Sequence, residues 1–459
     1  MLKQIFSYCL LYLLCTTAAA QPVYNYIPIK DDSLKLLAAK KLITQQYEKD
    51  SAGIQDENKK YIVAIYRDRY KSIKELFDDK ELISSPEADN YLSAVTSEII
   101  NKNPELKKIS PRFFFSRAYW PNAFSTGEGT IVFNIDLFTK LQNESQVAFV
   151  LCHELAHLYL DHSNKKIHKY ISTLYSEEMQ QKLKALKKKE YDKKEELDKL
   201  ELNMAFKHFR HNRDSESEAD SAALGFMKNT SYDCKEALTC LALLDEIDEE
   251  KIDIEKLLTN AFSFTDYPFK KRWLQKEDAF FGGISQDDKE KAIEDSLKTH
   301  PDCKARIKLL TPAVEQLVNN GKKFLQPEQQ FLNLQQLFSF EEVNYCLTGK
   351  KISRCLFNTL KLLEQNPANP YLISVTGQCL NEMYSKQKDH RLGTITDLPS
   401  PKREKKYNTL LEFIGRLSLL DISSIGYSYL KQYNTPLTGN AAYEKIFETS
   451  SKNLKDFKN

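Results

Sequence analysis

The chain has 459 residues, and 41% of them are hydrophobic, including 25 Phe and 24 Tyr. This length and apolar content can supply roughly two or three domain cores, which excludes a wholly disordered protein. Lys and Arg number 66 against 64 Asp and Glu, so the net charge is only +2. Proteins that bind nucleic acid are normally more basic, and we expect no nucleic-acid partner. The low content of 13 Gly and 15 Pro favours helices over a turn-rich β-sandwich.

The first twenty residues have the pattern of a secretory signal peptide. Lys3 gives a basic start, residues 5–15 form an apolar run, and Ala18 and Ala20 are small residues ahead of Gln21. The alternative is an uncleaved anchor, but the run is short for a bilayer span and no later stretch is long enough for one. We therefore expect cleavage between Ala20 and Gln21, a periplasmic or extracellular protein, and no integral membrane span in the mature chain.

The remaining sequence predicts a mainly α-helical fold with a small β-sheet. Residues 21–110 have helical periodicity and form a predicted N-terminal helical region. Residues 112–119 and 130–134 are typical of two strands, placed inside a predicted core of residues 111–315. Residues 316–459 change to helices separated by short polar turns, which predicts a separate helical region.

Two helical segments suggest roles beyond a core. Residues 352–365 and 371–384 flank a short turn that ends in Pro370, and this unit resembles a degenerate tetratricopeptide repeat. One such unit is weak support, because repeat arrays normally need about three copies or more. The strongly charged residues 177–202 predict a solvated helical hairpin, with a lid or a partner-docking arm as the alternative.

The clearest chemical motif is His-Glu-Leu-Ala-His, which begins at His153. On a helix His153 and His157 lie on one face, so both imidazoles can reach one metal ion, and Glu154 can accept a proton beside it. The alternative is a pair of surface histidines on an ordinary helix. The apolar residues throughout 147–160 favour a buried helix instead, where polar groups need partners. His162 follows five residues after His157, which on a continuous helix places it off the ligand face.

A catalytic zinc site needs a third protein ligand and one open position. Glu216 and Asp220 are four residues apart on a predicted helix and share a face. One of them can bind zinc while the other holds a ligating histidine through its second ring nitrogen. Glu218 is also a candidate by residue type, but it is rotated by about 200° from Glu216 on a helix.

These motifs together resemble a known family. Four elements carry the resemblance: the motif at 153–157, the Glu-Ser-Glu-Ala-Asp at 216–220, Pro121-Asn122-Ala123-Phe124 ahead of the strand 130–134, and Thr299-His300-Pro301 with Arg306. The sequence resembles the zinc endopeptidases of peptidase family M48, which include HtpX-type, Oma-type and CAAX prenyl endopeptidases. The resemblance covers roughly residues 60–315. It implies a zincin-like, more narrowly gluzincin-like, α+β peptidase core.

The resemblance assigns roles to the motif residues. It implies that His153, His157 and Glu216 bind one Zn²⁺ per chain, and that Glu154 is the general base. It also implies that Asp220 orients a ligating histidine without binding the metal itself. The pattern Glu-x-x-x-Asp matches Glu216 and Asp220, which selects Glu216 as the third ligand.

The same resemblance implies a substrate-binding edge strand. Asn122, Ala123 and Phe124 would bind an extended substrate by β-strand addition, which demands little of the substrate sequence. His300 is a further candidate that approaches the site from a loop. Unlike the membrane-embedded members of the family, this sequence has no apolar spans and is similar to the exported members.

We therefore expect an exported zinc metalloendopeptidase that cleaves unfolded or misassembled proteins in envelope quality control. The C-terminal helices could bind a protein partner. The alternative is a helical-repeat binding or chaperone-like protein with minor peptidase activity. The complete set of metal-binding residue types favours the enzyme, because a scaffold needs none of them.

Overall fold

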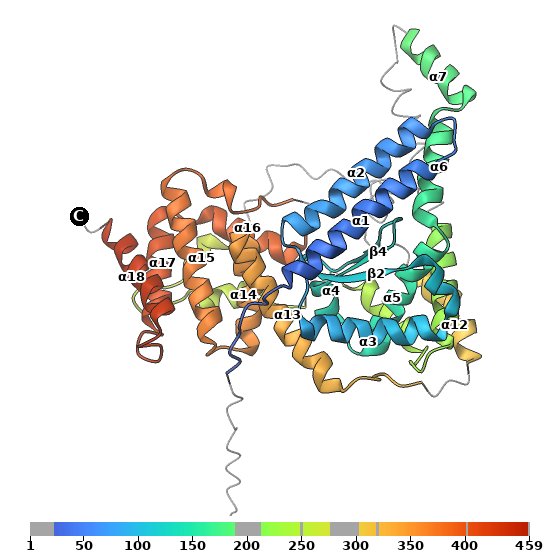
Figure 1. Cartoon of the computed structure of the whole chain (residues 1–459). Helices are drawn as coiled ribbons and strands as arrows, with labels where there is room; N and C mark the ends of the chain where they lie inside the picture. The colour runs from blue at the N-terminus through green and yellow to red at the C-terminus, as the bar shows by residue number, and fades with distance from the viewer. Residues whose placement is uncertain are drawn as a thin grey trace, which may run out of the picture.

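The computed structural model describes residues 23–188, 213–247, 251–275, 303–317, 321–400 and 403–457. The fold is mainly helical with one small β-sheet, which confirms the predicted fold class (Figure 1). The signal-peptide pattern, His300 and the second half of the charged stretch 177–202 lie outside the described residues. Within the described part of the chain, every helix is too short or too polar to cross a bilayer.

Among the described residues, the N-terminal two thirds of the chain contain most of the helices and all of the strands. The helices here are α1 (Ser33–Gly53), α2 (Lys59–Asp78), α3 (Pro86–Lys102), η1 (Pro104–Ile109), α4 (Ile135–Lys140), α5 (Glu144–Tyr159), α6 (His162–Leu174), α7 (Glu177–Lys188), a helix at 213–228, α9 (Glu236–Asp245), α10 (Ile254–Ala261), η2 (Lys271–Trp273) and α12 (Cys303–Glu315). The strands are β1 (Leu82–Ile83), β2 (Arg112–Ser116), β3 (Ala123–Ser125) and β4 (Thr130–Asn134).

The sheet has the order β1-β2-β4-β3, so β3 lies at one edge. Strands β2 and β4 are parallel, while β1 and β3 run antiparallel to their neighbours. Alternate residues of a strand face opposite sides of a sheet. Phe114 and Val132 face α1 and α2, whereas Phe115, Ile131 and Phe133 join the core that includes α3 and α5. The sheet is therefore covered by helices on both faces, and Figure 1 shows α1 and α2 on one side and α3 and α5 on the other.

Helix α5 runs through the centre of this core. Its N-cap is Asn143, whose side chain accepts a hydrogen bond from the Gln146 backbone N–H at 3.0 Å. The reciprocal bond of a capping box is different, because the Gln146 side chain accepts from the backbone of Gln142 rather than from Asn143. Every residue from Glu144 to Ala156 is buried, so the side chains in the middle of α5 are held in fixed positions.

The C-terminal region is built from helices alone. These are α13 (Glu328–Thr348), α14 (Ile352–Gln365), α15 (Pro370–Lys388), η3 (Leu392–Thr394), α16 (Lys405–Arg416), α17 (Leu419–Lys431) and α18 (Ala441–Lys455). The predicted pair 352–365 and 371–384 is present as α14 and α15, with Asn369 as the N-cap and Pro370 as the first helical residue. Helix α13 contributes Phe331 and Phe338 to the core of the sheet, and Val343 to the core of the C-terminal helices. The domain boundaries at 110 and 315 remain predictions.

Glu341 of α13 connects the C-terminal helices to the N-terminal part of the molecule. Glu341 is 1% exposed and accepts hydrogen bonds from the Tyr26 hydroxyl at 2.5 Å, the Ile29 backbone at 3.0 Å and Arg117 Nε at 2.6 Å. Arg117 also pairs with Asp31 at 3.0 Å. The segment that precedes α1 is therefore tied both to the end of β2 and to α13.

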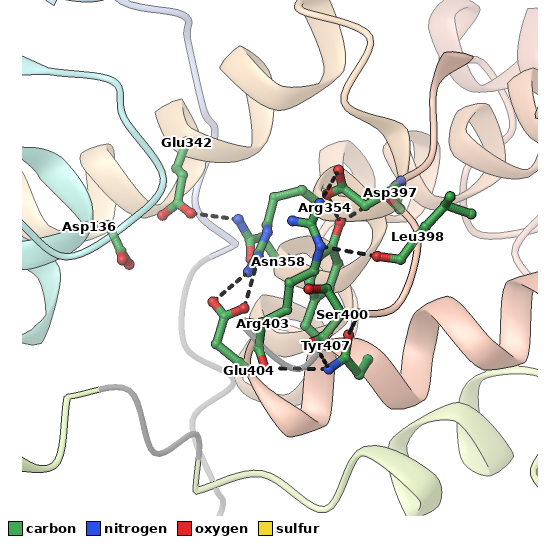
Figure 2. A network of polar contacts seen from close by, with 12 residues as sticks. Asp136, Glu342, Arg354, Asn358, Asp397, Leu398, Ser400, Arg403, Glu404 and Tyr407 are labelled. Atoms are coloured by element: carbon green, nitrogen blue, oxygen red, sulfur yellow. Dashed lines mark hydrogen bonds and ion pairs between the residues drawn. The ribbon is translucent and has the colours of Figure 1, made fainter. Parts of the chain in front are cut away.

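Glu342 faces the other side of α13, towards α14 (Figure 2). Asn358 Nδ2 donates to Glu342 Oε1 at 2.5 Å, and nearby Arg354 makes two hydrogen bonds of 3.1 Å to the Glu404 carboxylate. Figure 2 shows Asp136 of α4 on the side of Glu342 that faces away from Asn358. This group of side chains is called the junction network below.

Candidate metal centre

Two histidines of α5 converge on one point. His153 and His157 are four residues apart, so their rings project from the same face of the buried helix. Their Nε2 atoms are 3.0 Å apart, and the two rings are nearly perpendicular. His153 is 5% exposed, and Glu154 next to it is 6% exposed. The predicted motif therefore forms a buried cluster rather than a pair of surface histidines.

Glu216 reaches the same point from the helix 213–228. Its Oε2 lies 3.3 Å from His153 Nε2, and its Oε1 lies 3.4 Å from His157 Nε2. One donor atom from each of the three residues can be chosen so that all lie within 4.8 Å of one another. Donors bound about 2.0–2.1 Å from a tetrahedral zinc ion lie about 3.3–3.4 Å apart. The three side chains therefore fit a zinc ion by their spacing as well as by their donor types.

Asp220 and Arg306 hold His153 from behind. Asp220 Oδ1 is 2.9 Å from His153 Nδ1, so the ring nitrogen that does not face Glu216 has a carboxylate partner. Arg306 of α12 donates to both oxygens of Asp220, each at 2.7 Å. Asp220 is fully buried and Arg306 is 3% exposed. This bidentate pair fixes the carboxylate, which in turn fixes the orientation of the imidazole.

The charges at the cluster favour a cation. Burial raises the pKa of Glu216, but hydrogen bonds to His153 and His157 outweigh it and hold the pKa well below the ordinary value. Burial likewise raises the pKa of Asp220, and the hydrogen bonds from Arg306 and His153 lower it overall. For His153, burial lowers the pKa, and the hydrogen bonds to Asp220 and Glu216 raise it to about 10. Both carboxylates are thus ionised at neutral pH, so Glu216 can bind a metal ion and Asp220 can accept the Nδ1 proton of His153.

Glu154 points to the edge strand β3. Burial raises its pKa to about 7, with a smaller contribution from the charge of Glu216. Hydrogen bonds from the side chain and the backbone of Ser125 act in the opposite direction. A carboxylate whose pKa is near neutrality is well suited to accept and return a proton. Ser125 is absent from the sequence prediction, because a lone serine beside the Asn-Ala-Phe segment carries no signal of its own.

The edge strand β3 contains two of the predicted substrate-binding residues, Ala123 and Phe124, and Asn122 directly precedes it. The Asn134 backbone N–H donates to the Asn122 carbonyl at 2.9 Å. Because antiparallel ladders alternate, Asn122 and Phe124 turn their backbone groups towards β4, whereas Ala123 and Ser125 turn theirs away from it. The Phe124 side chain packs on the face covered by α1 and α2, away from the metal centre.

His162 lies outside the three-donor cluster, but it is closer to it than a continuous helix predicts. Its Nδ1 lies 2.8 Å from His157 Nδ1. The expectation assumed a continuous helix, whereas α5 ends at Tyr159 and the chain reverses before α6. Glu218, on the far side of the helix from Glu216, contacts His162 Nε2 at 3.2 Å.

Comparison with known proteins identifies the family. Residues 86–314, about half of the chain, match the model of peptidase family M48. The match includes the sheet from β2 onwards, α5, the helix 213–228 and nearly all of α12. The chain belongs to peptidase family M48, and is thus a member of a family of hydrolases that act on peptide bonds. No curated protein matches the chain as a relative.

Proposed function

We propose that the protein is a zinc-dependent metalloendopeptidase. His153, His157 and Glu216 hold one Zn²⁺ per chain, and Asp220 orients His153. The observation that carries this proposal is the convergence of two Nε2 atoms and one carboxylate at spacings of 3.0–3.4 Å. Three protein donors leave the fourth position of a tetrahedral zinc open, which is the pattern of catalytic rather than structural zinc. A helical-repeat binding protein, the other candidate, has no need for this donor set.

The residues of the site have different chemical roles. When bound, zinc supplies a Lewis acid that polarises a peptide carbonyl and lowers the pKa of a water molecule. Glu154 accepts the proton of the attacking water and returns it to the leaving amine nitrogen. Its raised pKa, about 7, suits both halves of this transfer. Arg306 and Asp220 act at a distance by keeping His153 in one orientation.

The edge strand supports a substrate in extended form. Ala123 turns its backbone N–H and C=O away from β4, so a peptide strand can pair with it next to Glu154. Backbone pairing is nearly independent of sequence but requires an unfolded segment. We infer that unfolded or misassembled proteins are the substrates. The signal-peptide pattern supports export, and hence envelope quality control as the role. The helices of residues 316–459 are a proposed site for a protein partner.

Zinc removal tests the function. The purified mature protein should contain about one zinc per chain, as a single three-donor site implies. It should cleave casein, and a chelator should abolish cleavage until zinc is restored. Casein that is cleaved equally with and without metal, at a zinc content near zero, would contradict the proposal. A heat-denatured and a folded form of one globular protein, compared as substrates, test the preference for unfolded chains.

A further inference from the structure

A reversal of the chain brings His162 back to the metal centre. Helix α5 ends at Tyr159, and Asp161 adopts a left-handed conformation with φ 56° and ψ 37°. Left-handed backbone is costly for most residues but tolerated by Asp, whose side chain here accepts a hydrogen bond from Asn164 at 2.7 Å. Helix α6 then begins at His162, which is 5% exposed. The reversal therefore buries an imidazole directly against His157.

The contact between the two histidines fixes their tautomers. The two Nδ1 atoms are 2.8 Å apart, so a hydrogen bond forms only if one of them carries a proton and the other does not. If His157 binds metal through Nε2, its proton is on Nδ1 and His162 Nδ1 is the acceptor. His162 must then carry its own proton on Nε2, the atom that lies 3.2 Å from the Glu218 carboxylate. A single series of donors thus runs from His157 through His162 to Glu218.

The two ligating histidines are held in different ways. His153 is backed by an ionised carboxylate that is fully buried and fixed by Arg306. His157 is backed by a neutral imidazole, and the Glu218 side chain behind it is 68% exposed. Solvent can replace an exposed carboxylate, but it cannot reach a nitrogen buried between two rings. The important support of His157 is therefore the ring of His162, with Glu218 as an aid.

We propose that His162 is a positioning residue that holds His157 in the tautomer and orientation needed to bind metal through Nε2. Glu218 selects the tautomer of His162 in turn. This inference rests on the proposed function, in which His157 is a zinc ligand. It goes beyond that function by giving the second histidine its own support, separate from the Asp220–Arg306 pair.

Replacement of His162 tests the proposal. His162→Leu removes the acceptor and should weaken zinc affinity by about 10–100-fold, the usual effect of losing the partner of a ligating histidine. His162→Gln has a side-chain oxygen that can accept from His157 Nδ1–H, and should recover most of the affinity. Glu218→Gln should change the zinc affinity only a few-fold, because water can replace the exposed Glu218 carboxylate. His168→Leu, on the same helix with a half-exposed side chain paired to Asp56, is the matched control and should bind zinc like the wild type.

The readouts are zinc affinity by chelator competition and the visible spectrum of the cobalt-substituted protein. Altered cobalt bands in His162→Leu, restored in His162→Gln, would support a role at the metal that a purely structural residue would not have. Zinc affinity within twofold of the wild type in a folded His162→Leu, or no recovery in His162→Gln, would overturn it.

A measurement on the wild type covers the case in which the leucine variant does not fold. The ¹⁵N shifts of the His162 ring in the zinc-loaded protein should show the proton on Nε2, and a proton on Nδ1 would overturn the proposal. A wild type without tight zinc binding would contradict both this inference and the proposed function. If the His162 variants change zinc affinity as expected but the wild type cleaves no peptide, only the proposed function is contradicted.

Discussion

The metal centre and the junction network both bury carboxylates, but Glu216 and Asp220 of the first are stabilised in their charged form, whereas Glu342 of the second is not. At the metal centre Glu216 and Asp220 face cationic or hydrogen-donating partners, and their pKa values lie below the ordinary values. In the junction network Glu342 faces Asp136, and burial together with that charge raises its pKa to about 8. Glu216 and Asp220 therefore hold negative charge ready for a cation, whereas Glu342 resists ionisation.

This difference shows that the protein uses different buried groups for metal binding and for the packing of its helices. A cluster built to bind a metal ion must keep ionised ligands in a fixed geometry, which the Asp220–Arg306 pair provides. A contact between helices needs only satisfied hydrogen bonds, and protonated Glu342 can still accept from Asn358. The comparison predicts that changes at the metal centre affect zinc and activity, and that changes at the junction affect stability and its pH dependence.

The largest effect is expected at Glu216. Glu216→Ala removes one of three donors and should abolish tight zinc binding and, with it, peptide hydrolysis. Zinc content and casein cleavage of the purified variant measure both. Glu218→Ala, two residues further along the same helix, should retain zinc with an affinity only a few-fold lower. Zinc lost in Glu218→Ala but retained in Glu216→Ala would reverse the assignment of the third ligand.

A smaller effect is expected when the support of His153 is broken. Arg306→Leu leaves the fully buried Asp220 charge without its bidentate partner. Breaking one member of a buried ion pair costs about 3–5 kcal/mol of unfolding free energy, and zinc affinity should also fall by about 10–100-fold. Lys308→Ala, at an exposed position of α12, is the matched control. A thermal unfolding midpoint unchanged in Arg306→Leu would show that the pair does not anchor the site.

The smallest effect is expected at the junction, and it depends on pH. The pKa of Glu342 rises from 4.5 in the unfolded chain to about 8 in the folded protein. The folded state therefore holds more protons than the unfolded state between these values, so stability falls as pH rises through this window. Glu342→Gln keeps the acceptor for Asn358 but has no charge. It should be more stable than the wild type by roughly 1–3 kcal/mol at about pH 9 and nearly equal near pH 4.

Thermal unfolding midpoints at the two pH values measure this effect. Glu328→Gln, at the exposed start of the same helix, should shift neither midpoint relative to the wild type. If the unfolding midpoints of the wild type and Glu342→Gln change with pH in parallel, then Glu342 does not carry the proton. Glu342 would then be ionised in the folded protein, as Glu216 and Asp220 are.

Sequence reasoning succeeded where local periodicity decides geometry. The spacing of His153 and His157 places both on one helix face, and the helix that carries them is buried as predicted. The face shared by Glu216 and Asp220 also follows from helical geometry, and in the structure both side chains contact His153. The mainly helical fold with a small sheet followed from composition and from the two apolar strand patterns.

Contacts between different elements could not be predicted from the sequence. His162 meets His157 only because Asp161 reverses the chain, and no periodicity reports a single left-handed residue. Helical periodicity does not predict that Glu341 and Glu342 of α13 are buried. Glu341 contacts Tyr26, which is far away in the chain, and Glu342 contacts Asn358 of the next helix. Local periodicity determines which face of an element a residue occupies. Tertiary packing determines which other element lies against that face.

The central claim is that Glu154 moves the proton in a zinc-assisted hydrolysis, and one measurement tests it most directly. The rate of casein cleavage is compared between the wild type and Glu154→Gln at equal, measured zinc content. Because glutamine preserves shape and the hydrogen-bonding reach towards Ser125 but cannot accept a proton, we expect full zinc occupancy with a rate lower by about 10²–10⁴-fold. A zinc-loaded Glu154→Gln that cleaves casein at nearly the wild-type rate would contradict the claim.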